Sequence, residues 1–296
     1  MEEQEQQQTT NQALPESLYH YTTQKGLYGI LDNECIWATH YRFLNDLSEC
    51  LEASELFEAE IRKQSSTKFA QSDLGKAGRE GYWSNIRNGL RAQIESSDAY
   101  FVSFTGGSTP QMPGDRLTLW RGYAENSQGF SLGFCQNKLQ QRVRSFGQQL
   151  QKPIPLMKCL YGETEESNCE RKAIIGTLVG FSGIDGQILE KVLEWSAKFK
   201  NEAFNEEREW RFVLQMSKAE RESNSARIEF HDGQFGRTPH IAIPLDLKSQ
   251  DSPLERIVVG PSPDKEQAAA RLRIKLVQMG IHGVEVVPSR IPYRNW

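Results

Sequence analysis

The segment NEEREWRFVL places five charged side chains at the start of an otherwise apolar stretch. Its aromatic and β-branched residues predict a strand over 207–215. Side chains alternate along a strand, so Glu207, Glu209 and Arg211 would share one face. Carboxylates fixed in a cleft can stabilise a cationic transition state or position a nucleophile. The alternative is an exposed ladder of self-paired charges, in which each pair contributes only about 0–1 kcal/mol to stability.

A second polar group lies near the N-terminus, in the stretch SLYHYTT. As a strand, this stretch places His20 and Thr22 on one face and Tyr21 on the other. An imidazole and a hydroxyl on one face can hydrogen-bond a ribose diol, and a tyrosine ring can stack on a flat heterocycle. The alternative is that His20 is an ordinary core or surface histidine with its hydrogen bonds satisfied.

Two arginines are candidates for phosphate contacts. Arg42 follows a predicted strand and precedes a predicted helix start, and its planar guanidinium matches two phosphate oxygens. The alternative is that Arg42 ties down the turn at Asn45 and Asp46. Arg121, in the stretch LWRGYAENSQGF, is a candidate for a second phosphate contact.

The elements that must position these residues follow from periodicity and turn signals. We expect strands at 17–23, 34–40, 98–105, 129–135, 155–162, 207–215, 226–232, 239–246 and 255–261. We expect helices at 24–33, 116–124, 170–200 and 263–279, and a helical layer or insertion at about 47–97. The order is not a regular βαβ alternation, and no GxGxxG follows the first strand. The pattern therefore predicts an α+β fold and argues against a Rossmann fold.

Composition sets the broad class. The chain has 296 residues, of which 38% are hydrophobic and 25% charged, with a net charge of −4. This is typical of a soluble globular protein and argues against a general nucleic-acid coat, although a local basic groove stays open. We expect a disordered polar tail at 1–15 and a single α+β domain at 16–296. The absence of a long apolar run and the acidic, glutamine-rich start favour a cytoplasmic protein without a membrane span.

Metal chemistry has weak support in the sequence. The five cysteines are scattered without a CxxC pair, there are only five histidines, and HExxH and a Walker loop are absent. We therefore expect no metal and reduced cysteines. A metal-dependent nuclease built on Asp46, Glu49, Glu207 and Glu209 stays open as an alternative, because hard cations favour clustered carboxylates.

Taken together, the motifs resemble a bacterial family of domains of unknown function. The shared stretches are YHYT at 19–22, IWAT at 36–39, RFLND at 42–46 with Glu49, SFT at 103–105, EEREWR at 206–211 and PSRIPYR at 288–294. The resemblance covers roughly residues 17–294. It identifies a family and leaves the activity open.

The order of motifs also resembles the ADP-ribosyltransferase superfamily, in particular its DNA-targeting toxin branch. His20, the Ser103-Phe104-Thr105 motif and the Glu207-Arg208-Glu209 motif occur in the order of that superfamily's three motifs. The middle motif is Ser-Phe-Thr here, where the superfamily has Ser-Thr-Ser. The resemblance implies a split, bent, mixed or antiparallel sheet with a helical layer, and NAD held in the cleft between its halves.

The resemblance also implies roles for individual residues. Glu209, or alternatively Glu207, would be the catalytic carboxylate, and Arg42 would pair with the pyrophosphate or orient the acceptor. The expected NAD-binding residues are His20, Tyr21, Thr22, Trp37, Ser103, Thr105 and Arg121. NAD would be a substrate, and no metal would be needed.

The expected function is therefore a transferase that moves ADP-ribose from NAD to a nucleic-acid or protein acceptor. The setting would be a bacterial toxin or an antiviral (phage) defence system, with a neutralising partner as a further possibility. The alternatives are the metal-dependent nuclease and a non-catalytic sensor that binds a nucleotide without turnover.

Overall fold

The chain folds into two compact units, each built from separate stretches of sequence. The computed structural model describes residues 15–44, 98–106, 114–125, 128–162, 164–179, 197–233 and 236–292, with isolated helical positions between 78 and 92. The first unit comprises Met1–Gln24, Gly106–Leu139 and Leu247–Trp296. The second unit comprises Lys25–Thr105 and Gln140–Asp246.

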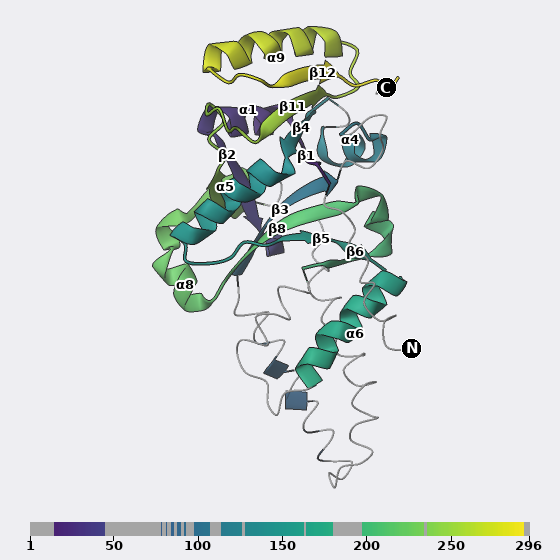
Figure 1. Ribbon diagram of the computed structural model, residues 1–296, viewed down its shortest axis with the longest axis vertical. Helices are drawn as coiled ribbons and strands as arrows, with labels where there is room; N and C mark the ends of the chain where they lie inside the picture. Colours follow the sequence, from purple (N-terminus) through teal and green to yellow (C-terminus); the bar gives the residue numbers. More distant parts are fainter. Residues whose placement is uncertain are drawn as a thin grey trace, which may run out of the picture. The chain divides into compact units, whose positions relative to one another are not determined.

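The first unit holds a mixed sheet in the order β12-β11-β4-β1. Its elements are β1 (Ser17–Thr22), α4 (Leu117–Tyr123), β4 (Phe130–Cys135), β11 (Leu254–Val259), α9 (Lys265–Met279) and β12 (Glu285–Pro288). The β1–β4 and β4–β11 pairs are antiparallel, and β11–β12 is parallel. A parallel pair needs a crossover, and α9 supplies it and lies along β12, in yellow in Figure 1.

Helix α9 shows how the sequence pattern places an element. Its buried side chains are Ala269, Leu272 and Leu276, spaced three and four residues apart, so one stripe of the helix faces the strands. The helix ends at Gly280, whose φ of 72° is left-handed and suits glycine. The N-cap position belongs to Asp264, and the Ser262 hydroxyl donates to its carboxylate over 3.0 Å.

The second unit holds the remaining strands, in the order β3-β2-β10-β9, with β8 paired to both β3 and β5. Its strands are β2 (Cys35–His40), β3 (Asp98–Gly106), β5 (Leu156–Lys158), β6 (Leu160–Tyr161), β7 (Phe199–Lys200), β8 (Glu209–Met216), β9 (Ile228–Gly233) and β10 (Gly236–Pro244). Its helices are α1 (Gln24–Asn33), α5 (Gln136–Gln149), α6 (Glu165–Val179) and α8 (Lys218–Ser223), with 3-10 turns η1 (Tyr41–Phe43), η3 (Glu202–Glu207) and η4 (Ser225–Arg227). The unit boundaries fall at the first residue of α1, at the end of β3 and within α5.

Strand β8 is the centre of the second unit. It pairs with β3 over eight residues, from Asp98 opposite Met216 to Thr105 opposite Glu209, and its other edge pairs with β5. Four consecutive residues of its middle, 211–214, are buried, and so is Met216 beyond the half-buried Gln215. A strand paired on both edges and covered on both faces holds its side chains rigidly.

The α+β class and a largely antiparallel arrangement are confirmed. Several expected bounds were wrong: the strand expected at 155–162 is two strands, β5 and β6, and β10 begins at Gly236 where 239 was expected. The helix expected at 170–200 is observed as α6, Glu165–Val179. The last two residues of the expected range form strand β7 instead. The strand expected from 207 begins at Glu209, because η3 ends at Glu207 and Arg208 is left-handed with a φ of 46°. The tail at 1–14 and nearly all of the insertion at 47–97 lie outside the described residues, so both stay predictions.

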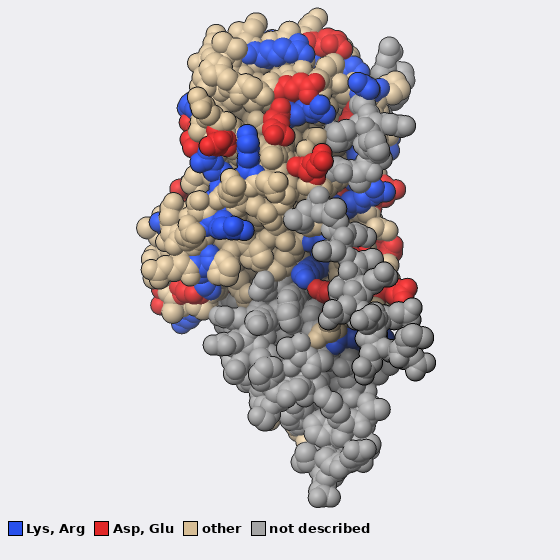
Figure 2. Space-filling view, in the orientation of Figure 1, with Lys and Arg blue, Asp and Glu red and all other residues tan. Residues whose placement is uncertain are grey.

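Charge is mixed over the surface. Figure 2 shows basic and acidic side chains of the described residues interspersed on the face in view. Within the part of the chain that is described, no helix has the length and apolarity needed to cross a membrane.

Candidate functional site

The start of β8 lies in a cluster of four charges, three of them buried. Glu209 is 5% exposed, Arg211 1% and Lys200 9%. Lys200 donates to the Glu207 carboxylate over 2.7 Å and to Glu209 Oε2 over 2.8 Å. Arg211 donates through Nε to Glu209 Oε1 over 3.0 Å, and its Nη2 lies 2.8 Å from Oε2. We call Lys200, Glu207, Glu209 and Arg211 the Glu209 cluster. The alternative of an exposed ladder of self-paired charges was wrong on exposure for Glu209 and Arg211, which are buried, although these two side chains do pair.

Local backbone geometry explains how Glu207 joins the cluster. We expected Glu207 and Glu209 on one face of a strand, but Glu207 is the last residue of η3. The left-handed Arg208 turns the chain between them, and Asn201 starts η3 by accepting a hydrogen bond from the Ala203 amide. Both carboxylates therefore reach Lys200 from different elements.

Neighbouring aromatic side chains hold the cluster in place. The Tyr161 hydroxyl accepts a 2.7 Å hydrogen bond from the Glu209 backbone amide. The Lys200 ammonium lies 4.7 Å from the centre of the Phe204 ring, and the Arg211 guanidinium lies 5.1 Å from the centre of the Phe101 ring. Cations over aromatic faces gain further electrostatic stabilisation where water is excluded.

The cluster keeps Glu209 ionised. Burial acts to raise the pKa of Glu209, but the charges of Arg211 and Lys200 and the hydrogen bonds from both outweigh it, lowering the pKa from 4.5 to about 2. Burial raises the pKa of Tyr161 far above its usual value, so its hydroxyl stays protonated. Glu209 is thus a permanent anion at neutral pH, matched by two cations.

Two residues of the SFT motif lie across the strand pair from this cluster. Thr105 is directly opposite Glu209, and Ser103 is directly opposite Arg211. Directly opposed residues point to the same face of an antiparallel pair, about 5 Å apart at Cβ. Thr105 is 5% exposed, and its hydroxyl has no hydrogen-bond partner among the residues that the structure describes. The structure therefore brings Ser103, Thr105, Glu207 and Glu209 together in the second unit.

Trp37 and Arg42 lie in the same unit but have other contacts. Trp37 is 38% exposed on β2, with its ring 4.6 Å from that of His231 and 4.2 Å from that of His240. Arg42 is exposed in η1, and its Nε donates to the Tyr41 hydroxyl over 2.8 Å. The turn at 45–46 that Arg42 was alternatively expected to hold lies outside the described residues.

The remaining predicted site residues belong to the first unit. His20 and Thr22 are partly buried on β1, opposite Leu132 and Phe130 of β4. The Tyr21 ring is buried edge-on against Trp120 at 4.8 Å, and its hydroxyl accepts from the Arg116 amide over 3.0 Å. Arg121 is exposed on α4. The packing of Tyr21 gives its ring a core role.

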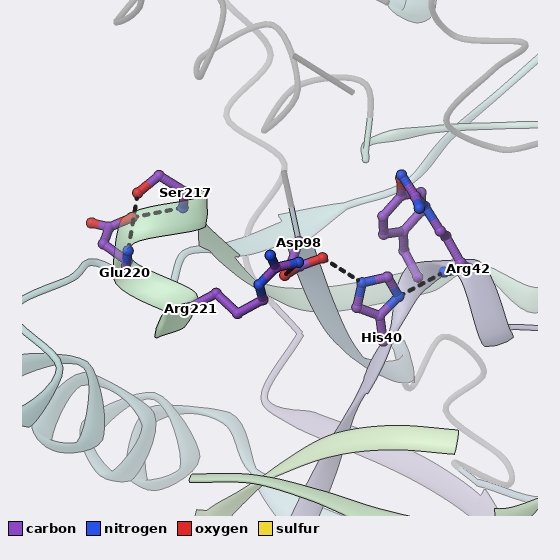
Figure 3. A network of polar contacts seen from close by, with 7 residues as sticks. His40, Arg42, Asp98, Ser217, Glu220 and Arg221 are labelled. Carbon is purple, nitrogen blue, oxygen red and sulfur yellow. Dashed lines mark hydrogen bonds and ion pairs between the residues drawn. The ribbon is translucent and has the colours of Figure 1, made fainter. Parts of the chain in front are cut away.

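A second buried network joins three elements of the second unit (Figure 3). His40, the last residue of β2, contacts Asp98, the first residue of β3, over 3.0 Å from Nε2 to Oδ1. Arg221 of α8 donates to the other Asp98 oxygen over 3.0 Å. The Arg42 amide donates to His40 Nδ1 over 3.3 Å, which makes Nδ1 the acceptor and Nε2 the donor. Both ring nitrogens are engaged, and burial lowers the pKa of His40, so this imidazole is neutral and positions the three elements.

Lys200, Tyr161, His40 and Asp98 were missed in the sequence. A lysine at the end of a predicted helix and a tyrosine in a predicted strand are ordinary residues, and their roles arise from pairing between distant segments. A lone His–Asp pair separated by 58 positions gives no local signal either. The one available signal was the charge of Lys200 close in sequence to three glutamates at 202, 206 and 207.

In the first unit, Asp115 forms a buried hydrogen-bond hub. Its carboxylate accepts from Trp120 Nε1 over 2.7 Å, from the Ser289 hydroxyl over 2.6 Å and from the Arg290 amide over 2.9 Å. The hub fixes Ser289 and Arg290 of the closing motif against the start of α4. This contact gives the closing motif a structural role.

Comparison with known proteins adds a family match. Residues 119–212 match the family model described as "Protein of unknown function (DUF2971)". The matched segment runs from α4 into β8 and contains all four residues of the Glu209 cluster, together with Tyr161. No curated protein and no solved structure matches the chain. The chain is thus similar, over this segment, to a family of unknown function.

Proposed function

We propose that the chain is an ADP-ribosyltransferase that uses NAD as substrate, with Glu209 as its catalytic carboxylate. The observation that carries the proposal is a buried carboxylate held ionised directly opposite Thr105, a buried hydroxyl without a partner among the described residues. An anion beside an unsatisfied hydrogen-bonding group is suited to a ligand that has hydroxyls and develops positive charge.

The reaction itself needs such an anion. The bond between the nicotinamide nitrogen and the ribose C1′ breaks, the bonding electron pair leaves with nicotinamide, and the ribose becomes oxocarbenium-like. An acceptor nucleophile then bonds to C1′ and loses its proton. A fixed carboxylate near the ribose stabilises the positive charge without reorganisation at the moment of reaction.

The low pKa of Glu209 restricts its role. A general base works best with a pKa near the working pH, whereas a carboxylate with a pKa of about 2 is a very weak base. Glu209 would therefore act by its charge and as a hydrogen-bond acceptor. Another group would then remove the proton from the acceptor. Glu207, the other carboxylate of the cluster, is our candidate for this role.

One observation favours a second candidate, a module that binds a nucleotide without turnover. Both oxygens of Glu209 are already engaged by Lys200 and Arg211. A carboxylate neutralised by two cations stabilises a developing cation less than a free one. In such a binding module, the Glu209 cluster would have a structural role and Thr105 would contact the nucleotide.

The nuclease alternative has no comparable support. Asp46 and Glu49 lie outside the described residues, and Glu207 and Glu209 are both paired with Lys200. No group of three histidine, cysteine or acidic side chains suited to a metal ion occurs in the described part of the chain.

The roles of the other predicted residues extend the proposal. Ser103 would contact NAD beside Thr105, and Arg42 would contact the pyrophosphate or the acceptor. The acceptor would be a nucleic acid or a protein, in a bacterial toxin or phage-defence setting.

The test is incubation of the purified protein with NAD labelled on the adenylate, in separate pools of DNA, RNA and cell lysate. Glu209→Gln is the test variant, and Glu206→Gln, an exposed residue of η3, is the matched control. Label transfer that Glu209→Gln abolishes and Glu206→Gln retains supports the transferase, and the labelled pool identifies the acceptor class.

Two other results would count against the transferase. Equal transfer by Glu209→Gln would exclude Glu209 as the catalytic carboxylate. Calorimetric NAD binding without nicotinamide release in any pool would favour the binding module.

A further inference from the structure

Three strands of the second unit bring two histidines and a tryptophan together away from the Glu209 cluster. Trp37 lies on β2, His240 on β10 and His231 on β9. The ring of Trp37 is stacked on that of His231 and tilted over that of His240, and the two imidazole rings are 5.0 Å apart at a steep angle. His240 is 2% exposed, whereas Trp37 is 38% exposed. The three rings therefore form one contact group at the border between core and solvent.

The two imidazoles touch through like atoms. His231 Nδ1 and His240 Nδ1 are 3.2 Å apart, which is hydrogen-bond distance. One of these nitrogens must then carry a hydrogen while the other offers its lone pair. If both Nδ1 atoms carried hydrogens, two donors would face each other and the contact would fail.

The surroundings bear on both tautomers of His240. Its Nε2 is buried with no hydrogen-bond partner among the described residues, and Glu229 Oε2 lies 3.8 Å from it, which favours a hydrogen on Nε2. The backbone of Thr238 hydrogen-bonds the His240 ring and raises its pKa, which favours a hydrogen on Nδ1. In either arrangement only one of the two facing Nδ1 atoms carries a hydrogen while the contact between them holds.

The other charged and titratable groups around the pair are few. On β9, Glu229 and Asp232 favour protonation of the histidines, while Lys25 of α1 opposes protonation of His231. On β2, Cys35 has a raised pKa through burial and the Glu229 charge. For both histidines, burial is the largest influence and lowers the pKa; for His240, the charge of His231 lowers it further. These directions agree with a pair that resists double protonation.

We propose that His231 and His240 form a coupled proton switch that controls the exposure of Trp37. With no added proton, or with one, the Nδ1 contact holds and both rings stay on Trp37. The second proton places a hydrogen on both Nδ1 atoms and a positive charge on both rings, so the contact breaks and His231, the less buried ring, moves away. This inference is independent of the proposed transferase function.

The test is titration of the ring nitrogens of 15N-histidine-labelled protein by NMR, from pH 8 to pH 4.5. The chain has only five histidines, so the signals are few, and single variants assign them. We expect His231→Gln to raise the pKa of His240, and His240→Gln to raise that of His231, each by about one pH unit or more, because strongly coupled sites titrate as a pair. The matched control is His282→Gln at an exposed site of the first unit, which should change neither value.

The results that would overturn the proposal are equally definite. If each histidine titrates at the same pH with and without the other, while the amide spectra show that both variants are folded, the two sites are not coupled. Using both variants keeps the test valid if His240→Gln fails to fold. A change in ring signals only with added Zn²⁺, reversed by EDTA, would replace the proton switch with a metal site.

Fluorescence gives an independent readout of Trp37. Because the chain contains six tryptophans, the Trp37 signal is obtained by subtracting the fluorescence spectrum of Trp37→Phe from that of the protein. We expect a red shift and easier quenching by iodide of this difference signal below the second histidine pKa, and no such change in His231→Gln. An equal change in His231→Gln would contradict the switch.

Discussion

Asp115 in the first unit and Glu209 in the second are both buried carboxylates, but their partners differ in kind. Asp115 accepts three hydrogen bonds from uncharged donors, two of them from residues more than 170 positions away. Glu209 meets two cations, and the whole cluster lies between positions 200 and 211. Asp115 therefore joins distant segments of the chain, whereas the Glu209 cluster concentrates four charges at one place.

The difference separates a structural carboxylate from a candidate functional one. Fixed neutral donors satisfy a carboxylate without bringing further charges into the interior. Burying charges costs several kcal/mol per ion in desolvation, and the attraction between them often only offsets that cost. Since Asp115 shows that a buried carboxylate can be satisfied without that cost, we place the proposed chemistry at Glu209.

The largest expected effect is on stability, when one cation of the cluster is removed. Arg211→Met should lower the free energy of unfolding by about 3–5 kcal/mol, because it leaves a buried carboxylate partly uncompensated. Urea unfolding followed by circular dichroism measures this. Adding Glu209→Gln to Arg211→Met should recover part of the loss; additive losses would mean that the two side chains are not coupled.

Acid should weaken the region of the Glu209 cluster. The pKa of Glu209 is about 2 in the folded chain and 4.5 ordinarily, so the unfolded chain takes up its proton first as the pH falls. The stability that Glu209 contributes, about 3 kcal/mol, is fully present above pH 4.5 and is lost between pH 4.5 and 2. Unfolding at several pH values should show a steeper acid loss for the protein than for Glu209→Gln; parallel curves would contradict the ion-pairing.

The Asp115 hub should respond less to loss of charge. In Asp115→Asn, one oxygen can still accept from Trp120 and Ser289, but an NH₂ group then faces the Arg290 amide. Because one hydrogen bond is lost, we expect the free energy of unfolding to fall by about 1–3 kcal/mol. Thermal unfolding measures it, with Asp251→Asn as an exposed control in the same unit. A loss as large as that for Arg211→Met would remove the distinction between the two regions.

The smallest effect on stability should come from Thr105→Val. This change removes a buried hydroxyl without a described partner and keeps the shape, so stability should stay within about 1 kcal/mol. If that hydroxyl meets the ligand, affinity for NAD should nevertheless fall roughly tenfold, equivalent to about 1.4 kcal/mol. Calorimetry with NAD checks this, and unchanged affinity would remove Thr105 from the site.

The sequence predicted those elements that local pattern determines. Helix α1 was predicted at its observed bounds, and β3 and α9 to within two residues, because apolar periodicity and Gly280 define them. The start of β8 was predicted wrongly because Arg208 is left-handed. Arginine seldom adopts this conformation, so the sequence gives no signal for it. Lys200 could not be predicted as a partner of Glu209, because its position depends on the pairing of β6 with β7, 39 residues apart at Leu160 and Phe199.

The most direct test of the central claim is the rate of nicotinamide release from NAD by the protein, by Glu209→Gln and by Glu206→Gln. We predict release by the protein and by Glu206→Gln, and a loss of at least a hundredfold in Glu209→Gln while its circular dichroism spectrum stays that of the folded chain. Release at the same rate by Glu209→Gln, or no release by any of the three proteins, would contradict it.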